Sequence, residues 1–285
     1  MPAPDRYAVL GHPIAHSLSP WIHSQFALQT GQHLRYTAID VAPGELAASV
    51  RSFFDQGGRG LNITVPHKQA VLELLDTLSE RARAAGAVNT IVLAAGQRLH
   101  GDNTDGIGFV RDLTQNLKVS AAGARVLLLG AGGAARGLIM PVLGLGVREL
   151  VIANRGAQRA QALAAEFAHL GAVRGVGLAE LEALDYALII NATAASLQQD
   201  LPQLPDCALD RETVCYDLAY GNSATPFVHW ARERGAAHAF MGTGMLVEQA
   251  AEAYLLWRGQ RPQTAPVLAA LRDAAPGSLI FTRHH

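Results

Sequence analysis

Lysine and cysteine are both scarce in this chain, which has two of each among 285 residues. Cys207 and Cys215 are too few for a disulfide framework and have no metal-ligand spacing, so we expect neither a framework nor a metal site. No basic run is present and the formal net charge is −1, which disfavours nucleic acid and anionic membranes as main partners. The first residues lack the basic region and long apolar stretch of a secretion signal, so the expected compartment is the cytoplasm.

No segment has the uninterrupted apolar length of a membrane span. Residues 126–147 come nearest, with Arg136 as their single charge, but a glycine cluster directly follows a short apolar run. That arrangement favours a buried strand, a tight turn and a helix over one continuous helix.

The composition is that of an ordinary soluble globular protein, with 49% hydrophobic and 16% charged residues. A chain of this length can bury a large core and is expected to divide into two domains. The expected partner is a small molecule, and the sequence leaves monomer and homodimer open.

Strand-like and helix-like segments alternate from the start of the chain, which predicts βαβ units and a mainly parallel sheet. The expected strands cover residues 7–13, 34–41 and 60–65, and the expected helices cover residues 19–31 and 43–57. Residues 67–86 are then predicted to be helical. Residues 89–103 are predicted to form a hairpin with its turn near Gly96.

A second alternation begins at residue 125 and is typical of a nucleotide-binding half-sheet. Its expected strands cover residues 125–132, 149–155, 186–193 and 212–220, with a helix after the first and another over residues 157–170. Residues 105–117 are expected to form a helix that joins the domains, and helices at 244–259 and 266–275 are expected to return to the first domain. The predicted fold is therefore α/β, with one domain at 1–105 completed by 243–285 and a Rossmann-type domain at 106–242.

The segment Gly130–Ala135 matches the dinucleotide pattern G-x-G-x-x-G/A between an apolar strand and a helix. Gly130 allows the tight turn, Gly132 lets the backbone approach a pyrophosphate, and Ala135 is small enough for close helix packing. The helix N-terminus adds N–H donors and a positive dipole. A glycine pattern alone can be just a turn, but the strand, spacing and helix together predict a nucleotide site.

The end of the next strand selects the cofactor. Where an NAD site usually has an acidic residue for the ribose hydroxyls, this chain has Asn154 and Arg155, followed by Arg159. A carboxylate would repel a 2′-phosphate, whereas guanidinium groups bind it with charge-assisted hydrogen bonds. These residues favour NADP(H), the alternative being that both arginines are solvated residues at a helix start.

Lys68 closes the segment NITVPHK in a chain that otherwise takes nearly all of its positive charge as arginine. Arginine keeps its proton at any working pH, whereas burial and neighbours can tune lysine into an acid or a base. The choice of lysine indicates proton transfer. The alternative is a solvated lysine in the first turn of a helix after Pro66.

Four polar clusters follow the predicted strands or turns, at residues 16–20, 62–68, 86–90 and 102–106. Because ligands of parallel sheets bind beyond the carboxyl ends of the strands, the clusters are expected to converge, with Asp105 as partner of Lys68. The alternatives are helix caps, Ser19 before Pro20 and Asp105 before the helix that follows it.

The chain resembles the shikimate dehydrogenase family over nearly its full length. The motifs that carry the resemblance occur in the family's order: GHPIAHSLSPWIH, NITVPHK, GAVNT, DNTDG, GAGGAARG, NRGAQRA, INAT, YDLAY and GTGMLVEQAA. The resemblance implies NADPH-dependent, reversible reduction of 3-dehydroshikimate to shikimate, a step of aromatic amino acid biosynthesis. It further implies that Lys68 gives and takes the proton at the reacting oxygen, with Asp105 as its partner, and that no metal takes part.

The resemblance also implies the residues of the two binding sites. Ser17 and Ser19 would hold the substrate carboxylate, and the ring hydroxyls would be contacted or supported by Thr64, Asn89, Asp105, Tyr220 and Gln249. The cofactor would be bordered by Glu80, Gly130, Ala131, Gly132, Gly133, Ala134, Asn154, Arg155, Gly156, Ala157, Gln158, Arg159, Leu218 and Gly242. Gln249 shares an apolar helix face with Met245, Ala253 and Leu256, where a buried amide needs partners, unless that face lies on the surface.

The sequence departs from the family pattern mainly on the cofactor side. Gly156 replaces a common threonine, Ala194 and Ala195 follow INAT where serine and another small residue are usual, and Met241 replaces an aspartate. Ser24 stands where asparagine is typical. These departures concern cofactor affinity more than chemistry.

Four other functions fit parts of the sequence. A quinate/shikimate dehydrogenase using NAD, or an aminoshikimate dehydrogenase, would share most of these residues, although Asn154 and Arg155 weigh against NAD. A non-catalytic sensor of a shikimate-like ligand would not need Lys68 and Asp105. A folate or amino-acid dehydrogenase would leave the pair Ser17 and Ser19 unexplained.

Overall fold

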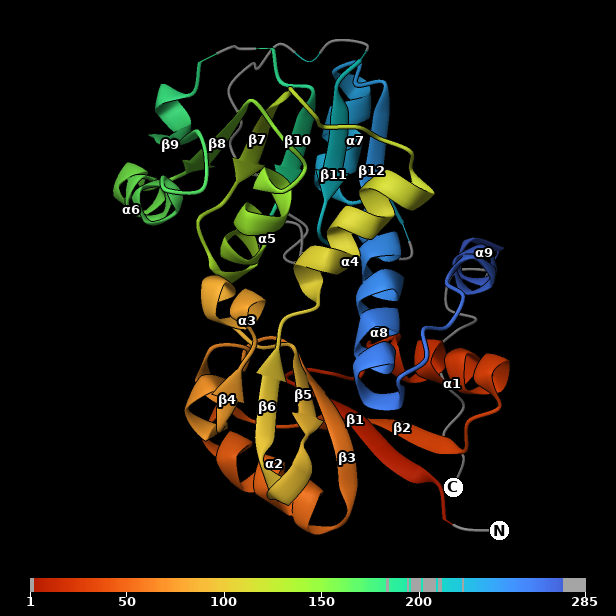
Figure 1. The fold of residues 1–285 in the computed structure, drawn as a ribbon. Helices are drawn as coiled ribbons and strands as arrows, with labels where there is room; N and C mark the ends of the chain where they lie inside the picture. Colours follow the sequence, from red (N-terminus) through yellow and green to blue (C-terminus); the bar gives the residue numbers. More distant parts are fainter. Residues whose placement is uncertain are drawn as a thin grey trace. The chain divides into compact units, whose positions relative to one another are not determined.

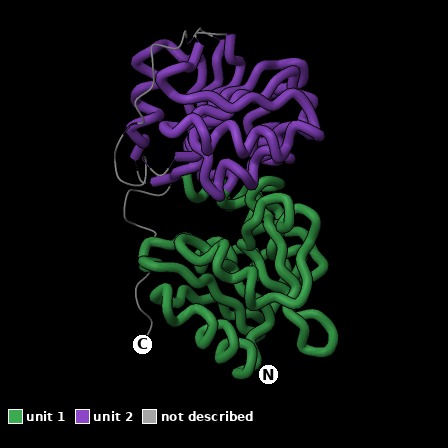
Figure 2. The backbone as a smooth tube through the Cα atoms, turned by 90° about the vertical axis from the view of Figure 1, so that its left-hand side faces the viewer, with its two compact units in different colours: residues 1–108, 246–285 green, residues 109–245 purple. Residues whose placement is uncertain are grey.

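The computed structural model describes residues 3–182, 185–193, 195, 201, 209, 212–221 and 223–273. The chain forms two compact units, residues 1–108 with 246–285 (unit 1) and residues 109–245 (unit 2) (Figure 2). It leaves unit 1 within helix α4 (Asp105–Arg111) and returns within helix α8 (Thr243–Arg258). The boundaries expected after residues 105 and 242 lie close to these divisions.

Unit 1 contains a six-stranded sheet of order β2-β1-β3-β5-β6-β4 (Figure 1). Its strands are β1 (Asp5–Gly11), β2 (Leu34–Asp40), β3 (Gly58–Ile63), β4 (Thr77–Leu78), β5 (Thr90–Leu93) and β6 (Leu99–Asp102). β1 pairs in parallel with β2 and β3, and β4 with β6, whereas β5 is antiparallel to both of its neighbours. The predicted parallel character is thus confirmed for β1 to β3, and the predicted hairpin is the pair β5 and β6, with Gly96 in the left-handed region between them (φ 72°).

The helix predicted over residues 67–86 is wrong as a single element. The structure has a 3₁₀ helix (Ala70–Leu74), then β4, then helix α3 (Glu80–Ala85). The backbone N–H of Asp76 donates to the carbonyl of Leu99, which draws the chain into the sheet. Ser79 then caps α3, because its hydroxyl accepts from the N–H of Ala82 at 3.1 Å.

Helices from both ends of the chain build the core of unit 1. They are α1 (Ser19–Thr30), α2 (Leu46–Asp55), α8 and α9 (Ala265–Asp273), with a 3₁₀ turn at Pro43–Glu45 before α2. Ile22 and Phe26 of α1 pack with Val247 and Tyr254 of α8 and with Leu268 of α9. The predicted return of the last helices to the first domain is therefore confirmed. In the part of the chain that the structure describes, no helix combines the length and apolarity needed to cross a membrane.

Unit 2 contains a second six-stranded sheet, of order β12-β11-β10-β7-β8-β9, in which all neighbours are parallel. Its strands are β7 (Arg125–Leu129), β8 (Glu149–Asn154), β9 (Val173–Gly177), β10 (Leu188–Asn191), β11 (Val214–Asp217) and β12 (His238–Met241). Its helices are the π-helical turn Asp112–Asn116 after α4, α5 (Gly133–Leu143), α6 (Ala157–Phe167), the 3₁₀ turn Leu178–Glu180 and α7 (Pro226–Glu233). The order is that of a complete doubly wound nucleotide-binding sheet.

The predicted half-sheet was too small, because β9, β12 and α7 were not predicted. β9 contains two glycines, and one of them, Gly175, lies against α6 so closely that a Cβ would come 2.3 Å from the Ala160 carbonyl oxygen. A glycine chosen for close packing removes the apolar signal by which a strand is predicted.

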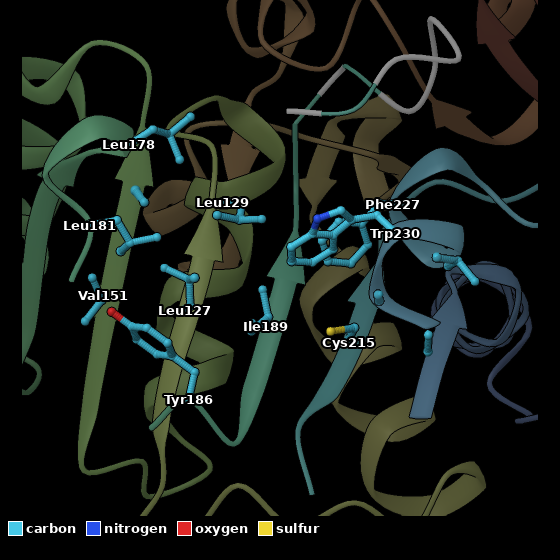
Figure 3. Close-up of a cluster of buried hydrophobic side chains, with 14 of the residues drawn as sticks. Leu127, Leu129, Val151, Leu178, Leu181, Tyr186, Ile189, Cys215, Phe227 and Trp230 are labelled. Carbon is cyan, nitrogen blue, oxygen red and sulfur yellow. The ribbon is translucent and has the colours of Figure 1, made fainter. Parts of the chain in front are cut away.

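Apolar side chains from the strands and from α7 pack together in unit 2 (Figure 3). Leu127, Ile189 and Cys215 come from three neighbouring strands and contact the same cluster as Phe227 and Trp230 of α7. Cys215 is fully buried here, which makes it a core residue. The rigid strands hold the loops that leave their carboxyl ends.

Candidate active site

Strand directions in unit 1 bring the polar clusters to one edge of the sheet. β1 and β3 are parallel, so residues 12–20 and 64–68 leave the sheet at the same edge. β6 runs parallel to β3, because each is antiparallel to β5, and it ends at Asp102, just before Asp105. β5 begins at that edge, next to Asn89. The predicted convergence of the clusters therefore follows from the hairpin.

Lys68 and Asp105 form an ion pair at this edge. The Lys68 Nζ lies 2.6 Å from the Asp105 Oδ2, and the side chains are 30% and 18% exposed. Lys68 lies in a turn after the cis peptide bond of Pro66, before the 3₁₀ helix begins, and its carbonyl accepts from the N–H of Val88 at 2.8 Å. Lys68 is therefore not a solvated residue of a helical first turn.

Asn89 and Gln249 lie beside this pair. The Asn89 Nδ2 donates to the Asp105 Oδ1 at 2.8 Å and lies 3.4 Å from the Gln249 Oε1. The Gln249 Nε2 donates to the Leu246 carbonyl at 2.7 Å. The two oxygens of the Asp105 carboxylate accept hydrogen bonds from Lys68 and Asn89. Asp105 therefore acts as the partner of Lys68, and not as the helix cap that the sequence left as an alternative.

Ser17, Ser19 and Thr64 occupy the loops at the same edge. The Ser19 N–H donates to the Ser17 Oγ at 3.3 Å, and Ser19 is the first residue of α1, whose N-cap is Leu18. The capping role considered for Ser19 is therefore wrong. The Thr64 Cγ2 would lie 2.4 Å from a Cβ at residue 11, which explains the glycine there. Hydroxyl groups at a strand edge, without a cation of their own, suit a ligand carboxylate as hydrogen-bond donors.

Partly buried ion pairs hold the elements that carry Asp105 and Gln249. Arg81 of α3 binds both oxygens of Asp102 at 2.7 Å and lies 3.2 Å from Glu252 of α8, which Arg261 also binds at 2.7 Å. Burial acts to raise the pKa of Asp102, but hydrogen bonds, chiefly from Arg81, outweigh it and leave that pKa below its usual value. The strand end before Asp105 and the helix of Gln249 are thereby tied together.

In unit 2, the glycine turn has the geometry that a dinucleotide requires. Gly130 lies in the left-handed region (φ 101°), and its N–H donates to the Ala153 carbonyl at 2.8 Å. Gly132 is the N-cap of α5, and a Cβ there would meet nothing within 4 Å, so the backbone is open to a ligand. Ala135 is a fully buried residue of the first turn of α5. The residues expected next to the turn, Ala131, Gly133 and Ala134, lie in it or in the first turn of α5.

The residues expected at the ribose lie at the end of β8. Asn154 is the last strand residue, and its Nδ2 donates to the carbonyl of Gly156, the N-cap of α6, at 3.1 Å. Arg155 and Arg159 are exposed, and neither forms an ion pair with another residue of the described chain. Ala157 and Gln158 complete the first turn of α6. Two unengaged guanidinium groups at this strand end fit a phosphate ligand.

Leu218 and Gly242 follow the neighbouring strands β11 and β12 at the same edge of the sheet. A Cβ at Gly242 would lie 2.3 Å from the Leu218 carbonyl oxygen, so only glycine fits there. Tyr220 is partly buried in unit 2, and burial raises its pKa above the usual value. Glu80 is exposed at the start of α3 in unit 1. Whether Tyr220 and Glu80 serve the ligands stays a prediction.

Comparison with known proteins assigns the chain to a family. Family models match it as "Shikimate dehydrogenase substrate binding domain" over residues 9–91, "Shikimate / quinate 5-dehydrogenase" over 112–208 and "Shikimate 5'-dehydrogenase C-terminal domain" over 242–272. A protein of Methylococcus capsulatus named "Shikimate dehydrogenase (NADP(+))" is 55% identical over 271 residues, which are 95% of this chain and 97% of that protein. The chain belongs to the shikimate dehydrogenase family.

Solved structures agree with this assignment. An Ael1 enzyme from Pseudomonas putida is 47% identical, with a TM-score of 0.86 over 94% of this chain and 98% of that one. The shikimate 5-dehydrogenase of Thermus thermophilus, solved in complex with NADP(H) and shikimate, is 36% identical, with a TM-score of 0.83 over 94% of this chain and 98% of that one. The predicted combination of an α/β fold with a Rossmann-type domain is confirmed.

The departures from the shikimate dehydrogenase pattern are accommodated without strain where the structure describes them. The Ser24 hydroxyl donates to the Trp21 carbonyl at 2.6 Å, within α1. A Cβ at Gly156 would approach only the Asn154 Nδ2, at 3.9 Å, so a threonine would fit and its absence leaves space. Met241 ends β12 and Ala195 is partly buried, whereas Ala194 lies outside the described residues.

The buried residues behind the candidate site were not predicted from the sequence. Asn62 and Thr90 lie within the motifs NITVPHK and GAVNT, and both are buried and hydrogen-bonded toward Asn89. Tyr36 of β2 lies outside every motif, although its hydroxyl donates to Asn62 at 2.7 Å. Asn62 and Thr90 could have been found only because they are polar residues at interior strand positions, where a buried polar group needs a partner. No feature of the sequence indicated Tyr36.

Proposed function

We propose that the protein catalyses the reversible, NADPH-dependent reduction of 3-dehydroshikimate to shikimate in aromatic amino acid (chorismate) biosynthesis. The observation that carries the proposal is the 2.6 Å ion pair of Lys68 and Asp105 at the strand edge of a chain of this family. The name of the Methylococcus relative specifies NADP(+), and the Thermus structure holds NADP(H) and shikimate. Both support the substrate and the cofactor.

In this proposal unit 1 is the substrate domain. Ser17 and Ser19 donate hydrogen bonds to the carboxylate of the substrate, which needs no arginine for this. Thr64, Asn89 and Gln249 hold the ring hydroxyls, and Tyr220 remains a predicted substrate residue. A site of neutral donors and acceptors discriminates by hydroxyl position, since each misplaced hydroxyl leaves a polar group unpaired.

Lys68 is the general acid of the reduction. NADPH would supply the hydride to the carbonyl carbon of the substrate. As negative charge develops on the carbonyl oxygen, the Lys68 ammonium stabilises it and gives up a proton to it. Asp105 accepts from Lys68 and from Asn89 at its two oxygens, so the ammonium is held by a fixed carboxylate. In the oxidation of shikimate, the neutral Lys68 amine takes the hydroxyl proton.

Unit 2 is proposed to bind NADP(H) at the carboxyl edge of its sheet. The N–H groups after Gly132 and the N-terminus of α5 face the pyrophosphate, and the open space at Gly132 permits close approach. Arg155 and Arg159 bind the 2′-phosphate, while Asn154 and Gly156 form the turn that presents them. Glu80 remains a predicted cofactor residue. The protein is further proposed to act in the cytoplasm as a monomer or homodimer, without nucleic acid or a membrane as partner.

The second candidate is a quinate/shikimate dehydrogenase, favoured by the match of residues 112–208 to a model that covers both substrates. An aminoshikimate dehydrogenase would share the same residues of unit 1. Steady-state kinetics of the purified protein with shikimate and quinate, each with NADP and with NAD, separate these functions. We expect the highest kcat/KM for shikimate with NADP. A higher kcat/KM for quinate with NAD would replace the proposal by its rival, and no turnover in any of the four combinations would reject both.

A further inference from the structure

Asn62 joins Tyr36 to the backbone of Asn89 in a defined direction. The Asn62 Nδ2 lies 3.0 Å from the carbonyl oxygen of Asn89, which can only accept a hydrogen bond. The other end of the amide, Oδ1, must therefore face the Tyr36 hydroxyl, 2.7 Å away. Because Oδ1 carries no proton, the tyrosine donates. Burial raises the pKa of Tyr36 well above its usual value, so the hydroxyl keeps this proton throughout the pH range of an assay.

Thr90 continues the chain of hydrogen bonds in the same direction. The Asn62 Nδ2 also lies 3.1 Å from the Thr90 Oγ1 and donates to it. The proton of the Thr90 hydroxyl is then directed to the Asn89 Oδ1 at 2.9 Å. The N–H of Thr104 donates to the same oxygen at 2.8 Å. The amide of Asn89 is thereby held with its oxygen toward these donors and its nitrogen away from them.

The Asn89 Nδ2 consequently points to Asp105. It donates to the Asp105 Oδ1 at 2.8 Å, while Lys68 donates to Oδ2 at 2.6 Å. A reversed amide would place its oxygen against the carboxylate, and two acceptors in contact repel each other. The direction of the amide therefore decides whether Asn89 donates to the carboxylate that Lys68 contacts or repels it.

We propose that Tyr36 is a positioning residue of the active site, whose hydroxyl donates the first of the hydrogen bonds that run through Asn62, Thr90 and Asn89 to Asp105. The ring of Tyr36 is fixed for this task, because it stacks on His23 with centroids 4.1 Å apart and planes 6° apart. Buried hydrogen bonds that form a continuous chain polarise one another, so loss of the first donor weakens the hydrogen bonds that follow it. The inference rests on the proposed function, since it assigns a role at the same site.

Tyr36→Phe removes the hydroxyl and keeps the ring. We expect kcat to fall about 10-fold, equivalent to about 1.4 kcal/mol, because the hydrogen bonds end on the proton-transfer pair. KM should rise by less than kcat falls, and the rise comes from Ser19, whose side chain also bonds to the Tyr36 hydroxyl. Tyr254→Phe is the matched control. Tyr254 is, like Tyr36, a buried tyrosine of unit 1, and its hydroxyl bonds to Thr30 at 2.6 Å, away from Asn62 and Asn89. It is expected to lower Tm by a similar amount and to keep the wild-type kcat.

Unchanged kcat in Tyr36→Phe, or equal losses of kcat in the two variants, would overturn the positioning role. Failure of the proposed function has a different signature, since it shows in the wild type as an absence of turnover with shikimate and NADP. In that case the two variants are compared with the substrate and cofactor pair of the four-way panel that the wild type does turn over. The pair Lys68 and Asp105 would serve any of those oxidations, so the comparison still decides the role of Tyr36.

Discussion

Replacement of Lys68 by alanine removes the amine on which the proposed chemistry depends. The variant should fold, because Asp105 is 18% exposed and keeps the hydrogen bond from Asn89 at 2.8 Å. Water can replace the ammonium, so the lost ion pair costs about 0–1 kcal/mol of unfolding free energy. The catalytic loss is larger, since both the charge and the proton donor disappear. We expect kcat to fall by about 10² to 10⁴, equivalent to about 2.7–5.4 kcal/mol in the barrier.

The assay is steady-state kinetics in both directions, together with NADPH affinity from fluorescence titration and Tm from thermal unfolding. NADPH affinity is expected to stay within about 3-fold of the wild type, because the residues proposed to bind it belong mainly to unit 2. Lys118→Asn is the control. It removes the only other lysine, at an exposed position in the left-handed region (φ 58°) that asparagine tolerates. A Lys68→Ala enzyme with kcat within about 10-fold of the wild type, outside the range expected for a general acid, would refute the assignment.

Four further substitutions test other parts of the structure. Arg155→Ala should weaken NADPH by about 10 to 100-fold and NADH little, because only NADPH carries the 2′-phosphate, and equal losses in titration would contradict that contact. Gly132→Ala should leave Tm unchanged and weaken NADP(H) binding by at least about 10-fold. Gly242→Ala should lower the free energy of unfolding by about 1–3 kcal/mol, because its Cβ would clash with Leu218. If thermal melting and cofactor titration show the reverse pattern, the role assigned to Gly132 in the turn is wrong. Burial lowers the pKa of His23 to about 3, below its unfolded value near 6.5, so stability is lost as pH falls below about 6.5. Urea unfolding at pH 7 and 5 should show His23→Phe losing about 2 kcal/mol less than the wild type, and identical losses would exclude His23 as the cause.

Local patterns predicted much of the fold and the site. Gly130 has the positive φ that the glycine pattern predicted, and Lys68 contacts Asp105, 37 positions later, because strand ends of a sheet share an edge. Short-range reasoning failed over residues 67–86, where apolar spacing favours a helix but pairing of Asp76 with Leu99 draws the chain into the sheet. Tertiary contacts decide such segments.

The residues that support the site were less predictable than the residues proposed to touch ligands. Tyr36 and Asn62 are 26 positions apart, and nothing in the local sequence of either indicates the other. Their contact depends on the strand order of the sheet, in which β1 separates β2 from β3. A motif reports residues close together in sequence, whereas orientation of an amide depends on neighbours that only the folded chain supplies.

Unit 1 is assembled from both ends of the chain, which has a consequence for biosynthesis. During translation the strands of residues 5–102 emerge first, but the apolar face of α1 stays uncovered until Val247 and Tyr254 have left the ribosome. Unit 2 is contiguous and can complete its sheet in the meantime. Lys68 and Asp105 would therefore gain Gln249 as a neighbour only at the end of synthesis. A nascent chain stalled before α8 would expose apolar surface to which chaperones bind.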